Sequence, residues 1–318
     1  MSLLSPIPAC AQASFTSASA APRAGVLSAL WLPTDANGRL MRAELSRHLD
    51  WLKSCGVHGV LALGSTGEFA RMTLAERESM LSAVASLAAP LPVIANITSI
   101  RLDEVIALGQ AAERLGLAGV ALMPPYFYPV SQDDMLEFFL RAADSIDLPF
   151  YLYNFPELTG NRIGLETVAA FADRARLAGI KQSGGEFAYH KDLIRLGEEK
   201  DFSVFSGSDL RLPEVFALGA KGAIGGLVNI VPELMVTIYE ICRNGRIGDP
   251  SVCAARMTAI GPVIDRLKFP LNVAAGLEAR GFNPGAPKTV VSPASLATYS
   301  GIVTDLRKMF ADWGLTTP

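Results

Sequence analysis

A lysine stands at the end of a short apolar run and is followed at once by small and polar residues. The run Leu177–Ile180 has the composition of a buried strand, and Lys181 comes directly after it. Burying an amine costs free energy, so a lysine at such a strand end typically serves as a nucleophile toward a carbonyl group. The alternative is a lysine whose stem is covered while its amine stays in water. Taken alone, the position of Lys181 leaves both interpretations open.

A tyrosine at the end of another apolar run could exchange protons with such an amine. Tyr153 closes the run that begins at Phe150, and a buried phenol needs a hydrogen-bond partner. If it lies beside Lys181, it can give protons to, and take them from, the amine and a bound substrate. Tyr151 lies deeper on the same side of the strand, and we expect it to donate to a backbone carbonyl instead.

A third candidate is the turn Gly64–Gly67, whose sequence Gly-Ser-Thr-Gly offers two hydroxyl groups and several free backbone N–H groups. Such a turn suits a carboxylate or a phosphate, although an ordinary glycine turn has the same composition. Nearby groups are expected to be structural. Glu68 could act as a base or pair with a nearby helix terminus, and the second role is favoured. Asp209 would cap the helix that it opens, and Asn154–Pro156 would set a rigid turn.

The sequence contains no pattern typical of a metal site. His48, His58 and His190 are far apart, and neither HxH nor HExxH spacing occurs. The four cysteines show no CxxC spacing, which argues against structural zinc and against a disulfide framework. We therefore expect chemistry without a metal or another cofactor.

These residues need a scaffold that brings strand ends together. From Gly25 on, apolar runs alternate with helical patterns, and the eight runs are Val26–Leu32, Val57–Leu63, Val93–Ile97, Val120–Met123, Phe150–Tyr153, Leu177–Ile180, Ser203–Phe205 and Ala223–Val228. Runs that are apolar throughout are typical of parallel strands covered on both faces. Eight strand–helix units predict a (β/α)₈ TIM barrel, whose chemistry gathers at the C-terminal ends of the strands. A doubly wound sheet would carry a glycine-rich loop after its first strand, and residues 31–34 contain no glycine.

Helical periodicity is clearest over Leu74–Ala88, where Thr73 and Glu76 predict a capping box. Beyond Asn229, helical stretches follow one another without strands. We therefore divide the chain into a mobile N-terminal arm at residues 1–24, a catalytic barrel at 25–243 and a C-terminal helical region at 244–318. The arm lacks the basic and continuous apolar segments of a signal peptide.

Composition narrows the class of protein. Half of the 318 residues are apolar and the net charge is −3, which suits a large core and does not favour nucleic acid as a partner. No run of 18 or more apolar residues occurs, so we expect no membrane span. A small molecule is the expected partner and the cytoplasm the expected location.

Together, the strand-end residues resemble the dihydrodipicolinate synthase / N-acetylneuraminate lyase family. The resemblance runs from about Gly25 to the C-terminus, and it is carried by Gly64–Glu68, Tyr153–Pro156 and Gly179–Ser183, with support from Ser206–Asp209 and Gly222–Gly225. It implies a Schiff-base lyase on a (β/α)₈ barrel, usually assembled as a homotetramer that is a dimer of dimers.

The resemblance also implies roles for single residues. Lys181 would condense with the ketone of pyruvate or another 2-oxo acid, and Tyr153 would donate and accept protons. Ser65 and Thr66 would hold the carboxylate of the substrate. The protonated imine would draw electrons from C3, so that a C–C bond there can be made or broken without a metal. Further substrate contacts are implied for Gly64, Gly207, Ile224 and Tyr126.

Several positions depart from the family pattern. Where members that make dihydrodipicolinate carry an arginine for the carboxylate of the second substrate, this chain has Leu158. Phe127 replaces a tyrosine that normally extends the proton relay. Leu210 replaces an acidic residue of the sialic-acid lyases, and Gly226 and Leu227 replace hydroxyl residues of the same pocket. These departures disfavour lysine biosynthesis and a long polyol substrate.

We therefore expect a carbon–carbon or carbon–oxygen lyase that acts on pyruvate or a related 2-oxo acid with a smaller or less polar tail. The favoured form is a Schiff-base lyase (aldolase) that makes or breaks a C–C bond, and a hydro-lyase is the other form. The first alternative is 4-hydroxy-tetrahydrodipicolinate (dihydrodipicolinate) synthase, which condenses pyruvate with aspartate semialdehyde. The second is a non-catalytic 2-oxo acid binding protein on the same fold, because a relay broken at Phe127 could leave binding without turnover.

Overall fold

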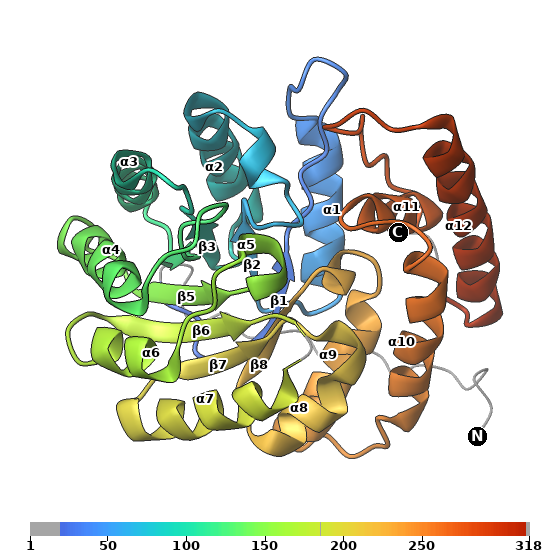
Figure 1. Cartoon of the computed structure of the whole chain (residues 1–318). Coiled ribbons are helices and arrows are strands. Elements are labelled where there is room, and N and C mark those ends of the chain that lie inside the picture. The colour runs from blue at the N-terminus through green and yellow to red at the C-terminus, as the bar shows by residue number, and fades with distance from the viewer. Residues whose placement is uncertain (1–19, 185, 316–318) are drawn as a thin grey trace.

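Eight parallel strands close into a barrel in the computed structural model, which describes residues 20–184 and 186–315 (Figure 1). The strands follow one another in chain order, and β8 closes the ring against β1. Their bounds are β1 (Gly25–Ala29), β2 (Gly59–Ala62), β3 (Val93–Asn96), β4 (Gly119–Leu122), β5 (Phe150–Asn154), β6 (Leu177–Gln182), β7 (Ser203–Ser206) and β8 (Gly222–Gly225). The predicted (β/α)₈ barrel is confirmed.

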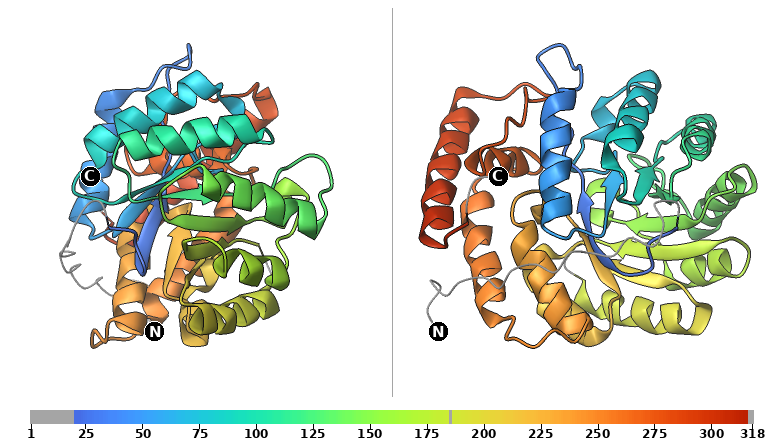
Figure 2. Two further views of the ribbon diagram at one scale, coloured as in Figure 1. Left: turned by 90° about the vertical axis from the view of Figure 1, so that its left-hand side faces the viewer. Right: turned by 180° about the vertical axis from the view of Figure 1, so that it is seen from behind.

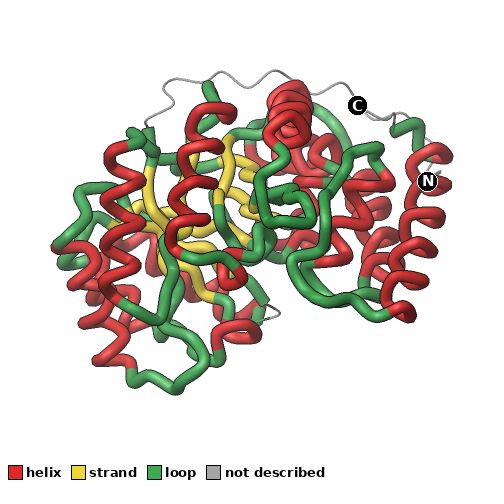
Figure 3. The backbone as a smooth tube through the Cα atoms, turned by 90° about the horizontal axis from the view of Figure 1, so that it is seen from above, coloured by secondary structure: helices red, strands yellow, loops and turns green. Residues whose placement is uncertain are grey.

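Helices surround the strands, as Figures 2 and 3 show from three further directions. The main helices around the barrel are α1 (Arg42–Ser54), α2 (Leu74–Ala88), α3 (Leu102–Arg114), α4 (Gln132–Asp144), α6 (Leu165–Ala172), α7 (Phe187–Lys200), α8 (Leu212–Leu218) and α9 (Pro232–Arg243). Short helical turns occupy the loops after four strands, namely η1 (Phe69–Arg71), α5 (Pro156–Thr159), η2 (Asp209–Arg211) and η3 (Leu227–Asn229).

The pairing of β5 with β6 sets the centre of the site. Every residue of both strands is buried, because side chains fill the barrel on one face and helices cover the other. The register places Tyr153 opposite Lys181 and Asn154 opposite Gln182. Parallel strands end at the same edge, so the two side chains predicted to be catalytic reach one end of the barrel.

Helix α2 begins as the sequence predicts. Thr73 Oγ1 accepts a hydrogen bond from the backbone N–H of Glu76 at 3.3 Å, and Glu76 Oε2 accepts one from the backbone N–H of Thr73 at 2.7 Å. This capping box fixes the start of the helix that follows the Gly64–Gly67 turn. Hydrogen bonds donated to the Glu76 carboxyl by the backbone N–H and the hydroxyl of Thr73 lower its pKa.

Three further helices in the described part of the C-terminal region pack beside the barrel near α1 and α9 (Figure 1). They are α10 (Ser251–Ile264), α11 (Leu271–Ala279) and α12 (Pro293–Asp312). Arg280 joins them to the barrel. Its buried guanidinium pairs with Glu233 of α9 and lies 4.9 Å from the ring centre of Trp51 and 5.3 Å from that of Phe310. The domain boundary after residue 243 stays a prediction.

Residues 20–24 contact the N-terminal end of the barrel. The hydroxyl of Tyr151 donates to the carbonyl oxygen of Pro22 at 2.7 Å, which confirms the partner predicted for this deeper tyrosine. Arg23 pairs with Asp201 at 2.6 Å. The rest of the predicted arm, residues 1–19, lies outside the described residues. None of the helices that the structure describes is both long and apolar enough to cross a membrane.

Candidate active site

A cavity of about 300 Å³ opens at the C-terminal ends of the strands. Residues from the ends of β5 and β6 and from the loops after β2, β7 and β8 line it, together with side chains of α10, α11 and the loop between them. Most of the predicted site residues meet there, and these are Ser65, Thr66, Tyr153, Lys181, Gly207 and Ile224.

Lys181 points into this cavity and not into bulk water. The residue is only 5% exposed, and its Nζ lies 4.2 Å from the ring centre of Tyr153. It forms no ion pair with any residue that the structure describes. Gly207 leaves room for the lysine stem, because a Cβ at that position would lie 3.3 Å from Lys181 Cε and would overlap Ser183 Oγ. The amine is thus enclosed and reachable from the cavity, and the acidic group whose charge acts on it, Asp209, lies in the same cavity without forming a direct ion pair with it.

The phenol of Tyr153 is held at its hydroxyl end and along its ring. Its oxygen shares a hydrogen bond with Ser65 Oγ at 2.8 Å. Its ring stacks on Phe155, with 6.3 Å between the ring centres, and carries Lys181 on its face. Because one side chain contacts both the amine and the serine, Tyr153 connects the predicted nucleophile, Lys181, to the turn after β2.

The turn after β2 is closed by its own backbone. The N–H of Gly67 donates to the carbonyl of Gly64 at 3.0 Å, and the N–H of Glu68 donates to the carbonyl of Ser65 at 3.1 Å. A side chain at Gly67 would crowd the end of β1, because a Cβ there would lie 3.1 Å from a backbone oxygen. Thr66 is 2% exposed and lines the cavity beside Ser65. The two hydroxyl groups therefore offer hydrogen bonds to an anion in the cavity.

Asp209 does not cap its own helical turn, so that prediction was wrong. Its Oδ2 accepts a hydrogen bond from the backbone N–H of Leu227 at 2.8 Å, across to the loop after β8. Gly225 permits this approach, because a Cβ there would overlap Asp209 Oδ1. That oxygen is buried without a hydrogen-bond partner among the described residues. Burial raises the pKa of Asp209 to about 6, against the opposing hydrogen bond from Leu227, the charge of Lys181 and the backbone N–H of Gly226.

Sequence reasoning missed the contribution of the C-terminal helices. Asn272, in the first turn of α11, is 7% exposed and lines the cavity, and its Oδ1 has no hydrogen-bond partner among the described residues. Phe269 forms part of the same wall. The only sequence signal for Asn272 is an amide inside the otherwise apolar start of a helix, Leu271–Ala275. Asp209 and Asn272 thus both bring polar atoms to the lining of the cavity.

Two predicted substrate contacts do not line this cavity. Gly64 takes part through its carbonyl oxygen, which closes the turn. Tyr126 lies in a neighbouring cavity of about 230 Å³, which shares Ser65 and also holds Leu158. Burial raises the pKa of the half-buried Tyr126. Phe127 does not line the cavity, and 81% of its surface is exposed. Roles for Gly64 and Tyr126 in substrate binding stay predictions.

The arrangement provides the parts of an imine mechanism. An enclosed amine can attack a ketone, a phenol on its flank can move protons, and a turn rich in donors can hold a carboxylate. The described residues contain no cluster of three or more His, Cys, Asp or Glu side chains placed to hold a metal ion.

Comparison with known proteins gives the family. The model of the dihydrodipicolinate synthetase family matches residues 22–308. An uncharacterized DapA-like lyase of Halobacterium salinarum is 32% identical over 269 residues, which cover 82% of this chain and 86% of the relative. A 4-hydroxy-tetrahydrodipicolinate synthase of Methanosphaerula palustris is 31% identical over 288 residues, which cover 86% of this chain and 99% of the relative.

Solved structures agree with this match. YagE, a prophage protein of E. coli K12 solved in complex with pyruvate, has a TM-score of 0.82 and 27% identity, with 90% of this chain and 98% of that chain covered. The chain belongs to the dihydrodipicolinate synthetase family, and the predicted class of enzyme, a Schiff-base lyase that depends on pyruvate or a related 2-oxo acid, is confirmed.

Proposed function

We propose that Lys181 forms the imine and that the enzyme makes or breaks the C3–C4 bond of a 4-hydroxy-2-oxo acid with a short tail. The observation that carries this proposal is the contact between Lys181 and Tyr153 inside the cavity, with the Tyr153 hydroxyl bonded to Ser65. A cavity of about 300 Å³ supports a substrate smaller than a sugar acid with a long polyol chain.

In the cleavage direction, the free amine of Lys181 attacks C2 of the keto acid, and water leaves as the protonated imine forms. Tyr153 takes the proton of the C4 hydroxyl. The C3–C4 bond then breaks, its electron pair moves toward the imine to give an enamine, and an aldehyde departs. Protonation at C3 and hydrolysis of the imine release pyruvate and restore the amine. Condensation runs through the same steps in reverse.

The remaining polar groups orient the substrate. Ser65 and Thr66 hold its carboxylate, which places C2 against the amine. The unpaired oxygens of Asp209 and Asn272 support a tail that carries a hydroxyl group, because a buried acceptor left without a donor costs free energy. An entirely apolar tail would leave both oxygens unsatisfied.

Trapping the imine tests the proposal directly. The protein is incubated with pyruvate and borohydride, and intact mass and peptide mapping are measured. We expect one reduced pyruvate per chain, attached at Lys181. Lys181→Ala should take up none while it keeps its fold, and Lys268→Ala, which changes a nearby exposed lysine, should label fully. An unlabelled wild-type chain, in a run where a known Schiff-base aldolase is labelled, would refute the proposal.

A second candidate is 4-hydroxy-tetrahydrodipicolinate synthase, the enzyme named for several relatives. Leu158 speaks against it, because leucine cannot pair with the carboxylate of aspartate semialdehyde. A coupled assay with pyruvate and aspartate semialdehyde separates the two. If turnover in this assay exceeds turnover on a panel of 4-hydroxy-2-oxo acids, the second candidate replaces the first.

The non-catalytic alternative predicts a different pattern, in which pyruvate is trapped on Lys181 and no hydroxy-oxo acid is turned over. We also propose a homotetramer, a dimer of dimers, in the cytoplasm. Exposed aromatic side chains near the site, Phe127 and Tyr128, support a subunit contact there. Light scattering on the purified protein measures the subunit number, and fractionation of the source cells measures the location.

A further inference from the structure

We propose that Lys288, from the segment between α11 and α12, is a positioning residue for the carboxylate-binding turn, which it holds through Glu68. The inference rests on the proposed function of Ser65 and Thr66. It adds a residue that touches neither the substrate nor Lys181, and it gives the C-terminal region a part in substrate binding.

Glu68 ends the turn after β2 in an unusual conformation. Its φ is +62°, in the left-handed region that side chains other than glycine rarely adopt. Its N–H closes the turn onto Ser65, and its carboxylate is buried, with 5% of the side chain exposed. Arg71 donates to Oε1 at 2.8 Å and Lys288 to Oε2 at 3.3 Å. A buried carboxylate that is two residues from Thr66 is thus held by two cations.

Lys288 also contacts the end of the first strand. Its Nζ donates to the carbonyl oxygen of Leu32 at 2.8 Å and lies 4.9 Å from the ring centre of Trp31. The side chain is 9% exposed. Burial lowers the pKa of Lys288, and the charge of Glu68 opposes the change. The ammonium group of Lys288 therefore connects the segment that follows β1 to the turn that follows β2.

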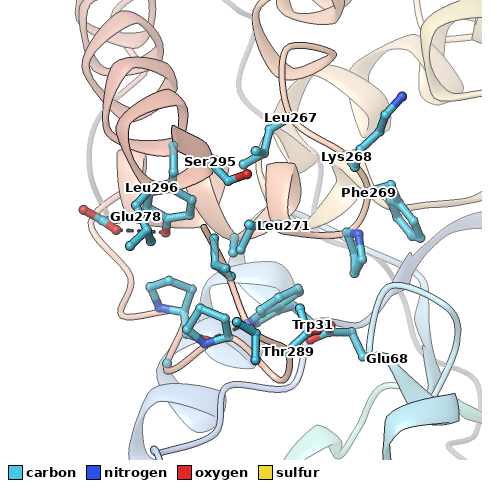
Figure 4. A pocket seen from close by; sticks show the side chains of 18 of the residues that line it. Trp31, Glu68, Leu267, Lys268, Phe269, Leu271, Glu278, Thr289, Ser295 and Leu296 are labelled. Carbon is cyan, nitrogen blue, oxygen red and sulfur yellow. Dashed lines mark hydrogen bonds between the residues drawn. The ribbon is translucent and has the colours of Figure 1, made fainter. Parts of the chain in front are cut away.

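The backbone that carries Lys288 is itself fixed to the barrel. Trp31 Nε1 donates to the carbonyl oxygen of Pro284 at 2.9 Å, and the N–H of Ala286 donates to the carbonyl oxygen of Thr34 at 2.7 Å. Gly285 has a φ of +82°, and a Cβ there would overlap the Thr34 backbone. Figure 4 shows Trp31, Glu68 and Thr289 together at one edge of the cavity between this segment and the C-terminal helices. The lysine is thus presented from a rigid support.

Electrostatics predict which kinetic constant depends on Lys288. A negative charge on Glu68 opposes the binding of a substrate carboxylate to the same turn unless a cation neutralises it. Arg71 is 41% exposed, so water and salt screen its effect, whereas Lys288 is buried and is screened less. Loss of Lys288 should therefore weaken binding of the 2-oxo acid and leave the chemistry at Lys181 nearly unchanged.

The test measures the rate of borohydride trapping against pyruvate concentration, which separates the half-saturating concentration from the maximal rate. For Lys288→Met we expect a half-saturating concentration raised ~10-fold or more, since one partner of a buried pair is lost, and a maximal rate within about threefold of wild type. Lys288→Arg should restore most of the affinity. Lys308→Met, which changes an exposed lysine of α12, should match wild type.

A double variant tests whether the charge of Glu68 causes the loss of affinity in Lys288→Met. If the uncompensated carboxylate causes the loss, Lys288→Met combined with Glu68→Gln should bind pyruvate better than Lys288→Met alone. Lys288→Gln serves if the methionine variant does not fold, because it keeps a donor for Leu32 and removes the charge. A folded neutral variant with wild-type half-saturation, or with only its maximal rate reduced, would overturn the inference. Failure of the wild-type chain to trap pyruvate would instead count against the proposed function.

Discussion

Lys181 Nζ lies 4.2 Å from the ring centre of Tyr153, whose hydroxyl is hydrogen-bonded to Ser65 Oγ at 2.8 Å. The phenol thus points toward the group proposed to bind the substrate carboxylate, while the amine rests on the face of its ring. A keto acid bound at Ser65 would bring C2 and its oxygen between the two. Tyr153 would then contribute both to substrate binding and to proton transfer. Removing only its hydroxyl group should show how much turnover depends on it.

We expect Tyr153→Phe to lower turnover by roughly 10²–10⁴-fold, the range for a positioned acid–base group. Stability should fall by about 1 kcal/mol, because one hydrogen bond, to Ser65, is lost while the ring and its stacking remain. Steady-state kinetics on the best hydroxy-oxo acid and urea unfolding measure the two effects.

Tyr151→Phe is the matched control for this change. Its hydroxyl is bonded to Pro22 at the other end of the barrel, so the stability loss should be similar and turnover should be unchanged. If Tyr153→Phe turned over at the control rate, Tyr153 would have no part in the mechanism.

Gly225→Ala tests whether Asp209 must approach the loop after β8. The added methyl group would overlap Asp209 Oδ1, so the carboxylate must move away from the N–H of Leu227. We expect the free energy of unfolding to fall by about 1–3 kcal/mol because of overpacking. We also expect a lower affinity for substrates with a hydroxylated tail. Pyruvate trapping should persist, because pyruvate has no tail that could bind to Asp209.

The neighbouring glycine provides the control. At Gly226 a Cβ would lie 3.6 Å from Thr66 Oγ1, an ordinary contact, and the backbone φ is −73°. Gly226→Ala should therefore cost less than about 1 kcal/mol, since alanine fits there without strain. Equal losses for the two variants, measured by urea unfolding, would contradict the proposed crowding at Asp209.

Acid should destabilise the protein partly through His48. This side chain is buried, its Nε2 donates to the carbonyl oxygen of Asn229 at 3.3 Å, and burial lowers its pKa to about 4. A histidine pKa lowered by folding gives stability that is present above about pH 6.5 and is lost as the pH falls toward 4. The loss from this group is on the order of 3 kcal/mol.

The comparison of wild type with His48→Gln isolates this contribution. The pKa values of His58 and His190 are also lowered, so these residues add to the acid loss in both proteins. We expect the free energy of unfolding to fall more steeply between pH 6.5 and 4 in wild type than in the variant. Parallel curves would show that His48 does not titrate with folding.

The sequence predicts best what is decided locally. The apolar run before Lys181 predicts a buried strand because both faces of a barrel strand are covered. Helix α2 begins at Leu74, directly after its N-cap Thr73, because the capping box needs only four residues. Strand ends of a barrel share one edge, so the meeting of Lys181, Tyr153 and Ser65 follows once the fold is predicted.

Contacts between distant segments were not predictable in this way. Asp209 bonds Leu227 because the ends of β7 and β8 meet and Gly225 has no side chain, whereas its own sequence favours a cap. Asn272 reaches the cavity only through the packing of α11 against the barrel. Tyr126 is close in sequence to a strand end, yet its ring packs against Phe69, with 6.1 Å between the ring centres, and lines the neighbouring cavity.

Asp209→Asn should change the pH dependence of both stability and substrate choice. Burial raises the pKa of Asp209 to about 6 from an unfolded value near 3.8. An acid whose pKa is raised by folding gives stability that is present below about pH 3.8 and is lost as the pH rises through 6. The amide of the variant stays neutral and does not titrate. The free energy of unfolding of Asp209→Asn should therefore rise relative to that of wild type as the pH increases across this range, by roughly 3 kcal/mol at most.

This dependence has the opposite sign to that of His48, so only the difference between wild type and Asp209→Asn, measured by urea unfolding from pH 4 to 7, isolates it. On the functional side, the ionised carboxylate accepts a hydroxyl hydrogen bond more strongly than an amide oxygen does. The affinity of wild type for a hydroxylated 2-oxo acid should therefore rise above about pH 6, while the affinity for pyruvate should show no such step. A step of equal size for both ligands in wild type, or one that persists in Asp209→Asn, would mean that another group titrates and that Asp209 does not contact the tail.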